Sequence, residues 1–81
     1  MPRYYFHSST DARFTDDEGF ECATPADARK MAIRTCSEMI HGAEDKFWGS
    51  RPWTITVTDA AGTIMYEIAV DGYASEAANQ A

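Results

Sequence analysis

Basic side chains are scarce in this sequence. Its 81 residues include 7 lysines and arginines against 13 aspartates and glutamates, which gives a formal net charge of −6. Phosphate backbones and anionic lipid surfaces attract proteins that carry an excess of positive charge. The charge balance therefore disfavours nucleic acid as a partner and a membrane as a binding surface, although it leaves a local basic contact open.

Cysteine is also rare, with only Cys22 and Cys36 in the chain. Two cysteines are too few for a disulfide framework. If a helix begins near Pro25, its rise of ~1.5 Å per residue separates the two by roughly 15–20 Å, whereas a disulfide needs Cα atoms within ~7 Å. We expect both thiols to be reduced and Cys36 to lie in the core.

Long hydrophobic runs and catalytic spacings are missing as well. No segment approaches the ~20 apolar residues of a membrane span, and the N-terminus lacks the apolar stretch of a secretory signal. The sequence holds no glycine-rich phosphate loop, no HExxH and no CxxC. We therefore predict a cytoplasmic, non-enzymatic protein without a membrane segment, metal site or cofactor, and we assign no catalytic residue.

What is present describes one small folded domain. Hydrophobic residues make up 44% of the chain and aromatic residues 12%, a composition unlike that of disordered proteins. A chain of this length has room for one core. We predict a single α+β domain over residues 1–71 and a flexible C-terminal tail over residues 72–81, which has little to bury.

Alternating hydrophobicity predicts four strands, because side chains of a strand point to opposite faces in turn. An acidic stretch and a glycine interrupt the second of them, so we interpret it as an irregular strand. The expected strands span residues 3–8, 13–22, 53–58 and 63–70. On the last strand the expected core-face residues are Ile64, Tyr66, Ile68 and Val70.

A helix is predicted between the second and third strands. Thr24 is a good N-cap, Pro25 fits the first helical position, and Asp27 occupies a variant of the capping box. Apolar residues then recur every three or four positions, and the helix is expected to end between Gly42 and Lys46. The element order is ββαββ: a four-stranded antiparallel sheet with one helix packed on one face. We favour the spatial order 2-1-3-4, with strands numbered along the chain, and a parallel pairing of the second and third strands stays open.

The acidic run after the first turn has two readings. Asp16, Asp17, Glu18 and Glu21 offer carboxylates to a divalent cation, but the spacing of an EF-hand loop is absent. A solvated turn explains the run better, and its charge would guard an irregular edge strand against unwanted pairing.

Several tracts together resemble a family of small bacterial proteins, common in alphaproteobacteria, that is described as a domain of unknown function. The resemblance covers roughly residues 1–70 and implies a fold without implying an activity. The tracts that carry it are the opening Met-Pro-Arg-Tyr-Tyr-Phe-His, the acidic segment with a glycine at 16–19, the alanine-rich helix from Ala26, and the hairpin from Trp53 to Gly62.

Two surfaces are candidates for partner binding. The open face of the sheet is expected to carry Arg3, Tyr5 and His7, an aromatic residue with basic neighbours, which in outline is how proteins stack single-stranded RNA. The loop over residues 47–52 carries Phe47, Trp48 and Arg51, and tryptophan and arginine are enriched at binding hot spots. The competing interpretations are a solvated sheet face and a hydrophobic lid over the helix end.

From these observations we expect a small interaction module that binds another protein or a second copy of itself. Self-association is favoured because small domains often gain stability that way. The alternative is a nucleic-acid-associated regulator that uses the open sheet face. A third hypothesis, a small enzyme, requires a polar pocket with shifted pKa values.

Overall fold

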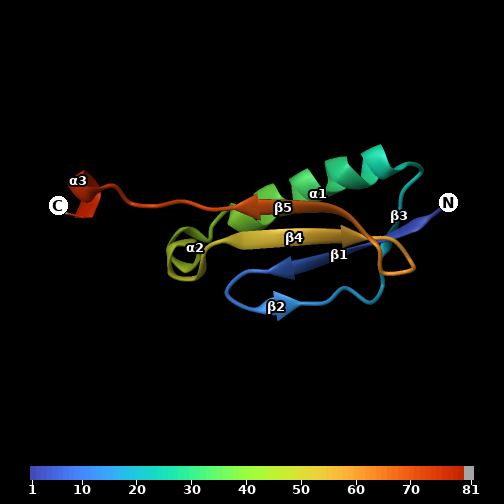
Figure 1. The fold of residues 1–81 in the computed structure, drawn as a ribbon, viewed down its shortest axis with the longest axis horizontal. Helices are drawn as coiled ribbons and strands as arrows, with labels where there is room; N and C mark the ends of the chain where they lie inside the picture. Colours follow the sequence, from blue (N-terminus) through green and yellow to red (C-terminus); the bar gives the residue numbers. More distant parts are fainter. Residues whose placement is uncertain (80–81) are drawn as a thin grey trace.

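A computed structural model describes residues 1–79 of the chain. It is an α+β structure in which one long helix covers one face of a five-stranded antiparallel sheet (Figure 1), so the predicted fold class is confirmed. The elements are β1 (Arg3–Ser9), β2 (Arg13–Phe14), β3 (Phe20–Glu21), α1 (Pro25–Ile40), α2 (Glu44–Ser50), β4 (Trp53–Thr58), β5 (Ile64–Val70) and α3 (Glu76–Asn79).

The strands differ from the prediction in one respect. The expected strand over residues 13–22 is two short strands, β2 and β3, which pair with opposite ends of β1. The continuous order is β2-β1-β4-β5, with β3 beside β1 off this path. Every pairing among the described strands is antiparallel, so the parallel pairing that the sequence left open is not found there.

Helix α1 begins as the sequence predicts. The Thr24 hydroxyl accepts a hydrogen bond from the Asp27 amide at 3.2 Å, and Pro25 stands at the first helical position. The buried stripe of Ala28, Ala32 and Cys36 faces β4 and β5. Small residues on this stripe let the helix backbone approach the sheet closely.

The predicted single helix is wrong, because the part of the chain that the structure describes forms three helices. Helix α1 ends at Ile40, earlier than expected, and Gly42 follows with a φ of 81°, a left-handed conformation that stops a helix. The segment over residues 47–52, expected as a loop, belongs mostly to α2. Acidic Glu44 and Asp45 in its first turn favour this helix through its dipole.

Strand β4 runs through the centre of the sheet and supplies the two largest fully buried side chains of the described residues, Ile55 and Val57. Trp53, Ile55 and Val57 are buried on its inner side, as the alternation predicts. Ile55 and Val57 pack with Tyr4 of β1 and the buried stripe of α1. Both cysteines are buried and free, as expected.

A β-bulge displaces one predicted core residue. Val57 pairs with Tyr66 while Thr58 pairs with Ile64, so Met65 is an extra residue in β5. An extra residue reverses the inward and outward alternation beyond it. Ile64 is consequently 58% exposed, and its expected place on the core face is wrong. The rest of the expected set packs against the core: Tyr66, Ile68 and Val70.

Beyond β5 the chain runs on in line with the strand, away from the body of the molecule, to α3 (Figure 1). We call the described part of this segment, Asp71–Asn79, the arm. The tail predicted over residues 72–81 includes most of the arm, and its last two residues lie outside the described part of the chain. No helix among residues 1–79 has the length and apolar character needed to cross a membrane.

Candidate interaction surfaces

Three aromatic rings meet where α2 joins β4. Phe47 makes edge-to-face contacts with Trp48 and with Trp53, at centroid distances of 5.7 and 5.8 Å. The buried Trp53 donates its indole N–H to the Ser50 hydroxyl at 2.8 Å. Phe47 therefore packs against a buried residue of β4, whereas Trp48 stays 50% exposed.

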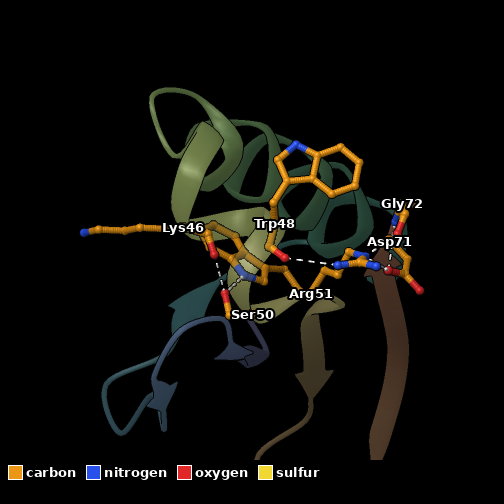
Figure 2. Close-up of polar contacts among 7 residues, drawn as sticks. Lys46, Trp48, Ser50, Arg51, Asp71 and Gly72 are labelled. Atoms are coloured by element: carbon orange, nitrogen blue, oxygen red, sulfur yellow. Dashed lines mark hydrogen bonds and ion pairs between the residues drawn. The ribbon is translucent and has the colours of Figure 1, made fainter. Parts of the chain in front are cut away.

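Arg51 links this aromatic corner to the start of the arm (Figure 2). Its guanidinium carbon lies 5.4 Å from the centroid of the Trp48 ring, and Nη1 donates to the Trp48 carbonyl at 3.0 Å. Nε donates to the Gly72 carbonyl and lies 3.7 Å from an Asp71 carboxylate oxygen. Arg51 thus makes both a cation–π contact and polar contacts, and it holds the first two residues of the arm against Trp48.

The three candidate residues of the open sheet face are engaged within the chain. Arg3 donates to the Glu18 carbonyl and pairs with Glu21, and the Tyr5 ring packs close to Gly19. Both ring nitrogens of His7 lie at hydrogen-bond distance from groups of the chain, the Asp16 amide and the Thr58 hydroxyl. Their placement gives no added support to stacking of nucleic acid, which stays a prediction.

His7 lies between the acidic loop and β4. Its Nδ1 accepts a hydrogen bond from the Asp16 amide at 3.1 Å, and its Nε2 lies 3.2 Å from the Thr58 hydroxyl. An N–H group can bond only to a ring nitrogen without a proton, so this geometry assigns the neutral tautomer with the proton on Nε2. His7 is therefore a structural link between the loop and the sheet.

The Asp16 carboxylate fills a gap in the sheet that the sequence does not reveal. Strands β2 and β3 pair with the two ends of β1 and leave the Phe6 amide between them. Asp16 accepts a hydrogen bond from this amide at 3.1 Å, and its other oxygen accepts from the Glu18 and Gly19 amides at 3.0 and 3.1 Å. The interpretation of the whole run as a solvated turn is therefore wrong for Asp16.

These contacts shift the acidity of Asp16. Burial raises the pKa of its carboxyl, but the hydrogen bonds from the Gly19, Phe6 and Glu18 amides outweigh burial, so the net pKa lies below the usual 3.8. Burial also raises the pKa of the Cys22 and Cys36 thiols. Over residues 1–79, no three His, Cys, Asp or Glu side chains are grouped so as to hold a metal ion.

The two edges of the sheet are built differently. On one side β2 and β3 have two residues each, and the Asp16 loop occupies the space between them. On the other side β5 has seven residues, among residues 1–79 it pairs only with β4, and it includes a single charged side chain, Glu67. Short and charged edges resist pairing with other chains, whereas a long edge with little charge invites it.

An apolar groove of ≈ 480 Å³ runs between α1 and β5 on the helix side of this edge. Ile33, on the groove's helical wall, is 57% exposed. The sequence did not point to this surface, although the low charge of β5 and its lack of proline were a usable signal. The other residues that line the groove are Cys36, Ser37, Ile40, His41, Ile68 and Val70.

The direction of the free backbone groups of β5 follows from the hairpin. The Asp59 amide donates to the Thr63 carbonyl, so Asp59 and alternate residues before it on β4 direct their backbone groups towards β5. Their partners on β5 are Tyr66, Ile68 and Val70. The residues between these partners, Glu67 and Ala69, must direct their N–H and C=O groups to the open side.

Comparison with known proteins gives one match. A family model described as a domain of unknown function, DUF6894, matches residues 3–71. No curated protein and no solved structure matches the chain. The match covers every strand of the sheet, α1 and α2, and it ends at Asp71, where the arm begins.

Proposed function

The chain belongs to the DUF6894 family of domains of unknown function, and we propose that it is a protein-interaction module that forms a homodimer through β5. The observation that carries this proposal is the unpaired side of β5 beside the uncovered apolar groove. Strand addition at an open edge is a common mode of protein recognition, in which main-chain hydrogen bonds supply affinity and side chains supply specificity.

Charge selects the register of the dimer. A two-fold axis that pairs the outward-facing residues of β5 can be centred on Glu67, Ile68 or Ala69. An axis centred on Glu67 places this residue opposite Glu67 of the second copy, and an axis centred on Ala69 places it opposite Asp71. Both arrangements are unfavourable, because like charges directly opposite each other destabilise a strand pair. Centring on Ile68 sets Glu67 against Ala69, so it alone brings no carboxylates together.

The same register supports burial of apolar surface. The axis at Ile68 brings the two grooves together, because Ile68 lines each of them. Ile33, at the outer side of α1, then faces the helix of the second copy across the joined sheet. Burial of apolar area stabilises association by about 25 cal/mol per Å², and the two joined grooves offer a continuous apolar surface.

The test is sedimentation equilibrium of the full chain from about 1 μM to about 1 mM. We expect a reversible transition from the 9.0 kDa monomer to a species of twice that mass. Ala69→Pro removes an outward N–H without touching the β4 side, and an edge strand tolerates proline there. Two symmetric hydrogen bonds of about 1 kcal/mol each are lost, so the dimer should weaken about 10-fold or more.

Ala69→Thr is the matched control, because it keeps the N–H and suits a strand. We expect it to dimerise like the wild type, and circular dichroism verifies that both variants are folded. A wild-type chain that stays monomeric across the range, or a proline variant that dimerises as tightly as the threonine variant, would overturn the proposal.

A further inference from the structure

The arm gives the molecule an unusual amount of surface. A compact protein of this mass exposes about 4,900 Å², whereas this chain exposes 5704 Å². Its radius of gyration is 14.7 Å, against about 12 Å for a compact chain of this length. The excess of roughly 800 Å² is close to what one partner buries in a standard interface. The arm carries Tyr73, which is 82% exposed.

The start of the arm is nevertheless fixed. Arg51 binds the Gly72 carbonyl and pairs with Asp71, and the Gly72 amide donates to the Asp71 carboxylate at 2.8 Å. A Cβ at Gly72 would lie 3.2 Å from the Trp48 ring, so the backbone passes directly over the indole. Figure 2 shows these contacts at the first residues of the arm, and Figure 1 shows the arm leaving the molecule in line with β5.

The proposed register determines which residues of the second copy lie beside the arm. With the axis at Ile68, Asp71 lies opposite the bulge residue Met65 of the second copy, and Tyr73 lies beyond this bulge, beside the segment that leads into the hairpin turn. Beside these two positions the second copy has a cleft of ≈ 420 Å³ at its hairpin end. Its lining is largely apolar and includes Pro2, Ala60, Ala61 and Met65.

We infer that the arm is exchanged between two copies, with Tyr73 of each seated in the hairpin-end cleft of the other. The inference rests on the proposed β5 dimer and adds the contact that extends it. An amphipathic tyrosine suits a cleft with apolar walls and a polar rim, where Arg3 and Asp59 lie. Arg51 acts as the positioning residue, because it fixes the point from which the arm crosses.

Disulfide trapping tests the exchange in the full chain. Met65→Cys and Tyr73→Cys are made on separate chains and mixed, because Met65 lines the cleft in which the exchange seats Tyr73 and a disulfide needs Cα atoms within about 7 Å. We expect mild oxidation to give a cross-linked heterodimer. In each variant alone the two identical positions are about 20 Å apart for Met65 and about 33 Å apart for Tyr73 along the strands, so neither should cross-link. Oxidised wild type controls for the buried Cys22 and Cys36.

Tyr73→Ala supplies a second measurement by sedimentation. We expect it to weaken dimerisation about 10-fold or more without lowering the thermal stability of the monomer. Phe14→Ala is the control, because Phe14 is also an exposed aromatic residue but lies on the opposite sheet edge, and it should leave the dimer unchanged.

The outcomes separate the two proposals. A dimer that forms no mixed cross-link and tolerates Tyr73→Ala overturns the arm exchange and leaves the β5 dimer standing. Cross-linking of Tyr73→Cys with itself overturns the register. A strictly monomeric wild type overturns the dimer and the exchange together.

Discussion

At the scale of single residues, a carboxylate takes the place of a strand. Asp16 bonds the Phe6 amide that neither β2 nor β3 reaches, and it closes its own loop through two further amides. Gly19 makes this possible: its φ is 73°, and a Cβ there would lie 2.8 Å from the Arg3 side chain. The loop can therefore lie directly against β1.

Replacing Asp16 by asparagine should destabilise the fold measurably. Asparagine keeps one acceptor oxygen but loses the charge, and hydrogen bonds to a charged group contribute about 1.5–3 kcal/mol. We expect the free energy of unfolding in urea to fall by about 1–3 kcal/mol. Asp17→Asn, on an exposed neighbour, should change it little, and equal losses in the two variants would contradict the role of Asp16.

The same residue sets a pH dependence. Because the folded pKa of Asp16 is below its usual 3.8, the unfolded chain binds this proton more readily. Its contribution to stability is therefore complete above the unfolded pKa and disappears as pH falls through the folded pKa. Urea unfolding between neutral pH and pH 3 should show a smaller loss for Asp16→Asn than for the wild type.

At the scale of elements, local signals predicted what local interactions determine. The cap at Thr24, the stripe of α1 and the alternation of β4 were all legible in the sequence, since each depends on neighbours a few residues away. The division of 13–22 into β2 and β3 was not legible, because it depends on pairing with β1. Likewise, Ile64 lies outside the core because of a β-bulge. The bulge depends on the register between β5 and β4, which the sequence of β5 alone does not show.

The N-cap of α1 gives the prediction at this scale. The Thr24 hydroxyl satisfies the Asp27 amide, and losing such a cap costs about 1 kcal/mol. Thr24→Ala should therefore lower the free energy of unfolding by about that amount, measured by urea titration. Ser75→Ala is the control: Ser75 accepts from the Ala78 amide at the four-residue α3, and α3 buries no residue. A Thr24 variant as stable as the wild type would contradict the prediction.

At the scale of the whole molecule, the interface that we propose differs from the surfaces that the sequence indicated. The sequence drew attention to charged and aromatic residues, such as Arg3 and Trp48, because these are enriched in binding sites. In the fold Arg3 is occupied within the chain, and Trp48 stacks with Arg51 at the base of the arm. The unpaired surface belongs to β5, and a strand's position at an edge is a property of topology that no single residue reveals.

The charge of the whole molecule predicts how salt affects the dimer. Each copy carries a formal charge of −6, and the proposed register sets no ion pair across β5, so the main long-range term between the copies is repulsion. Raising the salt from about 10 mM to about 0.15 M shortens the Debye length from about 30 to about 8 Å and screens that repulsion. Sedimentation should therefore give a lower dimer dissociation constant at the higher salt, while Ala69→Pro stays mainly monomeric.

Contacts with nucleic acid weaken as salt rises, so this dependence also separates the dimer from the alternative function. Tighter dimerisation at low salt would mean that oppositely charged surfaces meet, which contradicts an interface along β5.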